Sequence, residues 1–330
     1  MRGGFGHVRR CLSLAQALRV IGVESAFRLH GSEQLAMTLE REGFETTLVS
    51  HARDGEQTCD QAASRGVSWI VADSYDFDTA YLAALSLRGS RVLTIDDLAN
   101  QPLPVDAVVN GALGAEQVTY QVAPHTRLLL GSEYALLRKE FSAEPRRPID
   151  RGLRNVLVTV GGSDPHHLSE RLVRAASRAG AGSIDAVIGP LFEISPNQLA
   201  GAADRSRVDV HRTPQDMRSL MLRADVTLCA GGQTLYELAA TATPALAVRT
   251  AANQTPNLSA FSAAGITRWV GDVEDPVLDE RIVDALSLLF EDTEARAEMG
   301  RRGRAAVDGR GAERVATWID GIGRDRGGGR

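Results

Sequence analysis

The chain of 330 residues switches repeatedly between two hydrophobic patterns, and it does so in two successive stretches. Short continuous apolar runs, such as WIVAD at residues 69–73 and NVLVTV at residues 155–160, alternate with segments whose apolar residues recur at helical spacing. Continuous apolar strands separated by helices are typical of a parallel sheet that is covered on both faces. We therefore predict an α/β protein built from two such sheets.

The linker between the stretches is FSAEPRRPIDRGL at residues 141–153, which has two prolines, many charges and no periodicity. We predict two Rossmann-like domains facing across a cleft, over residues 1–142 and 154–320, with a linker at 143–153 and a flexible basic tail at 321–330. The predicted strands of the first domain are residues 24–29, 45–49, 69–73, 91–96 and 107–110. Those of the second are residues 155–160, 185–188, 208–211, 226–229, 245–248 and 268–270.

The first seven residues, MRGGFGH, already read as a loop, and an amphipathic helix follows at once. A Rossmann-like domain normally has a strand before such a loop. The first strand is therefore predicted to be missing. Either the true start lies upstream of Met1 or the domain lacks this strand, and we expect the former.

Composition excludes several function classes. The chain is 43% hydrophobic and 24% charged, and its net charge of −5 is interspersed, so it has no clustered basic face for nucleic acid. No apolar run approaches the roughly 18 residues of a membrane span, and no secretory signal opens the chain. The isolated Cys11, Cys59 and Cys229 are expected to be buried apolar residues. These features predict a cytoplasmic protein, whose oligomeric state the sequence leaves open.

The first domain carries its candidate chemistry in loops at the ends of strands. Gly3-Gly4-Phe5-Gly6-His7 is a predicted loop that leads into a helix, and a helix N-terminus favours a neutral imidazole on His7 that can accept a proton. The alternative is that His7 only caps or packs. Asp73, Tyr75 and Asp97 also end strands of this domain. The adjacent acids Asp96 and Asp97 could bind a metal, but no third ligand stands at a matching spacing. We therefore predict neither a metal nor a cofactor.

The second domain offers glycine pairs and polar residues in the same kind of place. Backbone N–H groups at a glycine loop before a helix can bind phosphate oxygens, and an acidic residue one turn into the helix can accept from ribose hydroxyls. The alternatives are a plain turn for the first glycine pair, a surface position for the acid and helix capping for Asn253. The candidates are Gly161, Gly162, Gly231, Gly232, Gln233, Thr234, Glu237, Asn253 and Gln254. His166 and His167 are predicted to be surface residues.

These motifs in this order resemble a known family, the UDP-2,4-diacetamido-2,4,6-trideoxy-β-L-altropyranose hydrolases of pseudaminic acid biosynthesis and their spore-coat polysaccharide relatives. The resemblance runs to about residue 310, and its most specific part is a GxGHxxR start joined to LLG-x-x-YALLR-x-x-F. The matching segments are GFGHVRRCLSLAQAL (4–18), DSY (73–75), IDDLA (95–99), LLLGSEYALLRKEF (128–141), VTVGGSD (158–164), CAGGQTLYEL (229–238) and NQ (253–254).

The resemblance implies a GT-B glycosyltransferase-like enzyme that takes water as its acceptor and hydrolyses a UDP-sugar with inversion. It implies that His7 is the general base, with Tyr75 and Asn253 beside the sugar. The second-domain glycines, Gln233, Thr234 and Glu237 would hold UDP, while Gly6, Arg9, Asp73, Asp97 and Gln254 would contact the sugar. Arg9 stands where the family usually has methionine. The alternatives are an inverting glycosyltransferase with the same donor and a non-catalytic nucleotide-sugar-binding protein.

Overall fold

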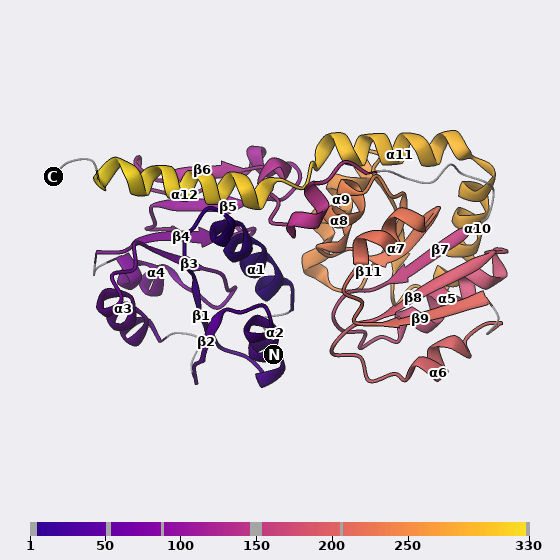
Figure 1. Cartoon of the computed structure of the whole chain (residues 1–330). Coiled ribbons are helices and arrows are strands. Elements are labelled where there is room, and N and C mark those ends of the chain that lie inside the picture. The colour runs from indigo at the N-terminus through magenta and orange to yellow at the C-terminus, as the bar shows by residue number, and fades with distance from the viewer. Residues whose placement is uncertain (1–4, 51–53, 87–88, 146–153, 205–206, 328–330) are drawn as a thin grey trace. The chain divides into compact units, whose positions relative to one another are not determined.

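The computed structural model describes residues 5–50, 54–86, 89–145, 154–204 and 207–327, and the chain divides into two compact units (Figure 1). The first unit joins Met1–Lys139 to Gly309–Arg330, and the second is Glu140–Asp308. Among the described helices, none is both long enough and apolar enough to cross a membrane.

The first unit contains parallel strands in two separate sheets. β1 pairs only with β2, and β3, β4, β5 and β6 form a second sheet in that order within the described residues. Its elements are α1 (Phe5–Val20), β1 (Ala26–Leu29), α2 (Glu33–Arg41), β2 (Glu45–Leu48), α3 (Gly55–Ser64), β3 (Trp69–Ala72), α4 (Thr79–Leu85), β4 (Arg91–Ile95), β5 (Ala107–Asn110), β6 (Arg127–Leu130) and α12 (Gly311–Gly327).

Helix α1 contributes to the cores of both sheets. Val8 and Leu12 pack in the cluster that includes Phe27 of β1, whereas Leu14 and Leu18 pack with Leu93 of β4. The sequence predicts Phe5, Gly6 and His7 as a loop, but the structure already has them in α1, and Gly3 and Gly4 lie outside the described residues. No strand precedes α1 in the described part of the chain.

The C-terminal helix α12 belongs to the first unit, so the predicted second domain of residues 154–320 is wrong at its end. Apolar residues at helical spacing on α12, such as Ala312, Val315 and Ile319, join the cluster that contains Leu14 of α1. Figure 1 shows α12 running alongside α1, and the rings of Trp318 and Trp69 are 5.3 Å apart. The predicted flexible tail is also wrong in part, because α12 continues to Gly327.

Two glycines allow close backbone contacts at the point where the C-terminal segment rejoins the first unit. A Cβ atom on Gly311, the first residue of α12, would lie 2.3 Å from the carbonyl oxygen of Ala135. A Cβ on Gly111, after β5, would lie 2.6 Å from Cα of Ala135. The backbone of Ala135 is therefore enclosed by two segments that are far apart in sequence, and neither position can accept a side chain without movement.

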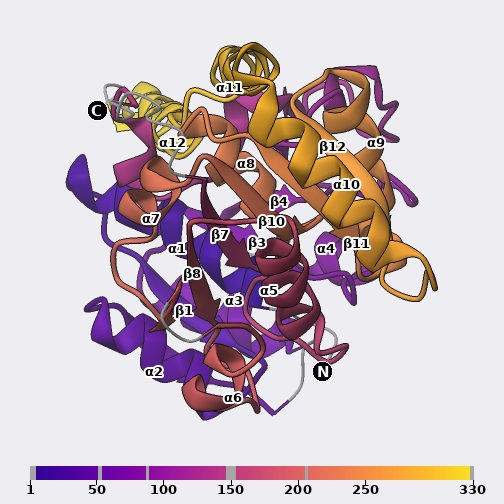
Figure 2. The ribbon, with the colours of Figure 1, turned by 90° about the vertical axis from the view of Figure 1, so that its right-hand side faces the viewer.

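The second unit is a six-stranded parallel sheet in the order β12-β11-β10-β7-β8-β9. Helices α5 and α10 pack against each other over it, as Figure 2 shows. Its elements are β7 (Asn155–Thr159), α5 (Leu168–Arg178), β8 (Ser183–Ile188), α6 (Pro196–Ala200), β9 (Val208–Arg212), α7 (Met217–Arg223), β10 (Val226–Ala230), α8 (Thr234–Ala240), β11 (Ala245–Arg249), α9 (Thr255–Ala263), β12 (Thr267–Asp272), α10 (Leu278–Glu291) and α11 (Thr293–Ala306).

The strand order of this sheet reverses at one place. From β7 the chain builds outward through β8 and β9, and it then returns to place β10 on the other side of β7. In open parallel sheets, ligands bind beyond the carboxyl ends of the strands at such a switch point. Residues 146–153 of the predicted linker lie outside the described residues, and residues 143–145 belong to the second unit.

Candidate functional site

A polar cluster lies where α1 meets the carboxyl ends of β3 and β4 in the first unit. Asp73 directly follows β3, and Asp97 lies two residues beyond β4. Because these neighbouring strands are parallel, their ends meet at the same edge of the sheet. His7 and Arg10, one turn apart on α1, reach this edge and contact Asp73.

Asp73 is the centre of this cluster. Its side chain is only 2% exposed, and Oδ1 lies 2.6 Å from Nδ1 of His7 and 2.6 Å from Nη2 of Arg10. Oδ2 accepts from Nε of Arg10 at 2.7 Å and from Sγ of Cys11 at 3.4 Å. Burial raises the pKa of Asp73, but the charge and hydrogen bonds of Arg10, with a smaller contribution from His7, outweigh it and hold that pKa below its ordinary value.

This environment fixes the tautomer of His7. An ionised Asp73 can only accept hydrogen bonds, so a 2.6 Å contact requires the proton on Nδ1. Nη2 of Arg10 also lies 3.2 Å from Nδ1, but a donor there would need a bare Nδ1 facing the carboxylate, with lone pairs opposed. The shorter contact decides the assignment. Nε2 then carries the lone pair, and it has no partner among the described residues.

The second carboxylate, Asp97, is joined to the same cluster through Arg10 and Tyr75. Its Oδ2 accepts from Nη1 of Arg10 at 3.2 Å and from Oη of Tyr75 at 3.1 Å. The ring of Tyr75 lies edge-on to the imidazole of His7, with centroids 4.6 Å apart. Burial and the charge of Asp97 raise the pKa of Tyr75 to about 12, so its phenol is a hydrogen-bond donor at neutral pH.

Four of the predicted first-unit residues, His7, Asp73, Tyr75 and Asp97, thus meet in one place. Two others do not join them: the cluster uses Arg10 rather than Arg9, and a Cβ on Gly6 would meet no atom within 4 Å. Cys11 was also missed, since it was expected to behave as an apolar residue; Cys59 and Cys229 are buried as predicted. The missed signal is helical spacing, because residues three and four positions after His7 lie on its face of α1.

The predicted UDP-binding glycines of the second unit lie at the switch point. Gly161 and Gly162 follow β7, and Gly231 and Gly232 follow β10, the neighbouring parallel strand. Gly161 has a φ of +100°, which requires glycine, and a Cβ on Gly189 after β8 would lie 2.3 Å from the Gly161 carbonyl oxygen. The alternative of a tight turn therefore holds for Gly161, whatever it binds.

Gly231 and Gly232 have different structural roles. A Cβ on Gly231 would lie 2.5 Å from Cγ of the buried Leu258, so packing requires this glycine. A Cβ on Gly232 would meet no atom within 4 Å. Gln233 is the N-cap residue of α8 and Thr234 is its first residue, and Glu237 in the first turn is only 5% exposed. The alternative of a surface position for Glu237 is therefore wrong.

The two predicted site residues after β11, Asn253 and Gln254, differ in their contacts. Asn253 is exposed, and the helix-capping alternative is wrong because Gln254 is the N-cap residue of α9 and no side chain caps it. Gln254 folds back on Thr250, accepting from its backbone N at 2.9 Å. A polar group on the substrate would have to compete with this contact for Gln254, whereas Asn253 has an unengaged side chain within the described ranges.

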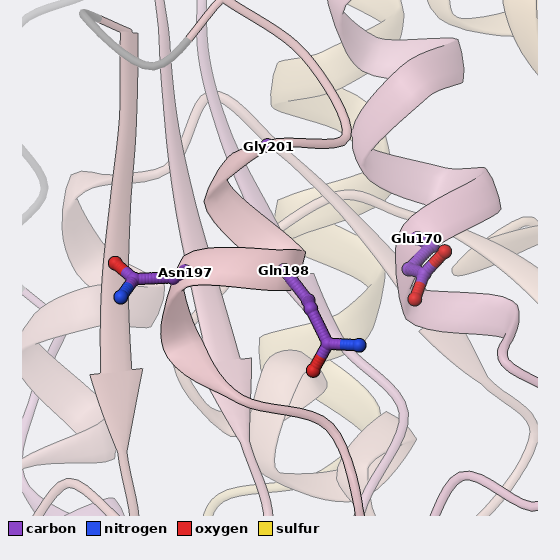
Figure 3. A pocket seen from close by; sticks show the side chains of 4 residues that line it. All are labelled: Glu170, Asn197, Gln198 and Gly201. Carbon is purple, nitrogen blue, oxygen red and sulfur yellow. The ribbon is translucent and has the colours of Figure 1, made fainter.

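The remaining polar candidates do not form a site. His166 and His167 are exposed, as predicted, and precede α5, which starts at Leu168; Asp164 accepts from the first two N–H groups of that helix. No group of three potential metal ligands occurs within the described residues. Figure 3 shows a hollow in the helical layer of the second unit, and none of the predicted site residues lines it. Its lining residues are Glu170, Asn197, Gln198 and Gly201.

Comparison with known proteins places the chain near enzymes of sugar metabolism. No protein-family model matches it. It is 25% identical over 325 residues to the spore coat polysaccharide biosynthesis protein SpsG of Bacillus subtilis (strain 168), covering 95% of this chain and 93% of the relative. It is 24% identical over 301 residues to the pseudaminic acid cytidylyltransferase and UDP-2,4-diacetamido-2,4,6-trideoxy-beta-L-altropyranose hydrolase of Helicobacter pylori (strain ATCC 700392 / 26695). That alignment covers 88% of this chain and 52% of the relative, so the chain spans about half of that protein.

Solved structures define the fold. The TM-score is 0.64 with MurG of Acinetobacter baumannii, at 16% identity over 96% of each chain. It is 0.67 with LpCGTa in complex with UDP, at 12% identity over 96% of this chain and 97% of that one. The chain therefore has the α/β fold of GT-B glycosyltransferases, with two Rossmann-like units, as the sequence predicts.

Proposed function

We propose that the chain hydrolyses a UDP-linked sugar of the diacetamido-trideoxy class to UDP and the free sugar, with inversion at the anomeric carbon. The observation that carries the proposal is the 2.6 Å contact between Nδ1 of His7 and Asp73, which leaves Nε2 of His7 as a proton acceptor. The sequence similarity to SpsG and to the Helicobacter pylori protein supports a nucleotide-sugar substrate.

In the proposed reaction, a water oxygen attacks the anomeric carbon while His7 Nε2 takes one of its protons. The bond from that carbon to the diphosphate oxygen breaks, and its electron pair leaves with UDP. General base catalysis of this kind contributes about 10²–10⁴-fold to the rate. Asp73 stabilises the imidazolium as it forms, because the carboxylate already accepts from Nδ1. Tyr75 and Asn253 are assigned to positions beside the sugar.

The proposal assigns UDP to the second unit. The glycine loops after β7 and β10 meet at the switch point, and the open position of Gly232 lets a ligand approach its backbone. Backbone N–H groups there would stabilise the charge that develops on the departing diphosphate. Glu237 is assigned to the ribose hydroxyls, with Gln233 and Thr234 on the phosphates.

The second candidate is an inverting glycosyltransferase that uses the same donor with a glycan or natural-product hydroxyl in place of water. Its support is the fold itself, which the chain shares with GT-B glycosyltransferases. The base would be the same, since His7 Nε2 can accept a proton from an alcohol as well as from water.

The experiment that tests the proposal follows UDP release from a panel of UDP-sugars, with and without added sugar acceptors. We expect release without an acceptor, and we expect His7→Asn to reduce it by about 10²–10⁴-fold while the affinity for UDP changes little. Release that depends strictly on an acceptor would favour the transferase. Loss of UDP binding in His7→Asn would contradict the assignment of the base.

A further inference from the structure

Asp97 is the accessible carboxylate of the first-unit cluster. Its side chain is 32% exposed, whereas that of Asp73 is 2% exposed. Arg10 and Tyr75 both donate to Oδ2 of Asp97, and Oδ1 has no hydrogen-bond partner among the described residues. One oxygen of an ionisable group beside His7 is therefore free to accept from a ligand.

The negative charge of Asp97 is only weakly compensated. Arg10 is the cationic side chain that bonds to it, but this guanidinium gives Asp73 two bonds, at 2.6 and 2.7 Å, and Asp97 a single bond at 3.2 Å. Tyr75 contributes a neutral hydroxyl. The cluster holds two carboxylates, Asp73 and Asp97, and one guanidinium, Arg10, and Asp97 is the carboxylate at its exposed side.

From this arrangement we infer that Asp97 determines specificity by charge at the sugar. This inference rests on the proposed function, because it places the sugar of a UDP-sugar beside His7. Oδ1 of Asp97 accepts from a hydroxyl, amide or ammonium group on the sugar, and it repels a sugar that carries a carboxylate. A charge-assisted hydrogen bond is about twice as strong as a neutral one, and like charges in contact are disfavoured.

The test compares two matched pairs of ligands. UDP-glucose and UDP-glucuronate differ by a carboxylate at C6, and UDP-N-acetylglucosamine and UDP-glucosamine differ by an acetyl group that removes the cationic amine. Their dissociation constants are measured by calorimetry, relative to UDP alone, for the full chain, for Asp97→Asn and for Glu133→Gln. Glu133 is an exposed acid after β6 and serves as the control for loss of one negative charge.

We expect the unmodified chain to bind UDP-glucuronate at least about tenfold more weakly than UDP-glucose, and UDP-glucosamine at least as tightly as its acetylated counterpart. Asp97→Asn should bring the first ratio to within about threefold of one, whereas Glu133→Gln should leave it unchanged. Equal binding of UDP-glucose and UDP-glucuronate by the unmodified chain, or the same ratio in Asp97→Asn, would overturn the inference.

Failure of the hydrolysis proposal and failure of the role of Asp97 can be told apart. If UDP-sugars bind with this charge order but no UDP is released from any of them or from a UDP-linked diacetamido-trideoxy sugar, the specificity assignment stands and the hydrolysis proposal fails. If UDP is released from UDP-glucose and UDP-glucuronate equally, the reaction stands and the role of Asp97 is wrong. If no UDP compound binds, both are wrong.

Discussion

Nδ1 of His7 lies 2.6 Å from Oδ1 of Asp73, a residue 66 positions away in sequence. One partner comes from the first turns of α1 and the other from the end of β3. Arg10 donates to the same carboxylate, and this keeps Asp73 ionised despite its burial. The pair is thus held in one protonation pattern, with the proton on Nδ1 and the lone pair on Nε2.

The substitution Asp73→Asn should reduce turnover by about 10²–10⁴-fold. An asparagine can present its N–H₂ group to Nδ1, which moves the ring proton to Nε2 and removes the base. The affinity for UDP should stay within about threefold, since the glycine loops belong to the second unit. Steady-state kinetics and UDP titration measure the two effects, with Glu133→Gln as a control. Unchanged turnover in Asp73→Asn would show that the tautomer of His7 does not matter.

Replacing Gly232 with alanine should separate binding from folding. Its Cβ enters open space, so the free energy of unfolding should change by less than about 0.5 kcal/mol. The methyl group should nevertheless weaken UDP binding by about tenfold or more, because it blocks approach to the backbone.

The matched variant is Gly231→Ala, whose Cβ meets the buried Leu258 at 2.5 Å. It should lower the free energy of unfolding by about 1–3 kcal/mol. Calorimetry and urea denaturation distinguish the two variants. Full UDP affinity in Gly232→Ala would place the nucleotide elsewhere.

Two glycines of α12 should respond in opposite directions to alanine. Gly311→Ala places a methyl group 2.3 Å from the carbonyl oxygen of Ala135 and should destabilise the first unit by about 1–3 kcal/mol. Gly321→Ala meets no atom within 4 Å and should stabilise the helix by about 0.5–1 kcal/mol. Urea unfolding followed by the fluorescence of Trp69 and Trp318 measures both. Equal effects of the two substitutions would mean that α12 does not require close contact at Gly311.

The phenol of Tyr75 should titrate at high pH, at about 12 rather than at its ordinary value of 10.0. Between these values the unfolded chain loses the proton and the folded chain keeps it, so the contribution of Tyr75 to stability is present below pH 10 and is lost as pH rises towards 12. Difference absorbance of tyrosinate between the unmodified chain and Tyr75→Phe isolates this group. A midpoint near the ordinary value would mean that Tyr75 is neither buried nor in contact with Asp97 as the structure has it.

Local pattern predicts most of this fold because continuous apolar runs become buried strands, as in β7 and β10. Strand β6 was missed because its apolar run is only three residues long, at residues 128–130, after the exposed Arg127. The assignment of α12 to the second domain was wrong for a different reason. Its periodicity shows that one face is apolar but carries no information about which core that face covers.

The sequence predicts which residues form the candidate site better than it predicts the contacts between them. His7, Asp73, Tyr75 and Asp97 were expected from their places at strand and helix ends, but the hydrogen bond from His7 to Asp73 depends on how β3 is positioned against α1. The choice of Arg9 over Arg10 was avoidable, since only Arg10 shares the face of His7. Glu237 was expected near a ligand, and its burial depends on the packing of α8.

Because the C-terminal segment returns to the first unit, the two units cannot complete their folds in the order in which they are synthesised. Residues 140–308 are contiguous, so they can acquire their structure while synthesis still continues. The residues of the first unit that precede Glu140 emerge from the ribosome before the second unit, yet their core lacks Val315 and Ile319 until α12 has been synthesised. The unit that carries His7 can therefore complete its core only after residues 140–308 have been synthesised, and a nascent chain arrested before α12 would have a complete second unit and an incomplete first one.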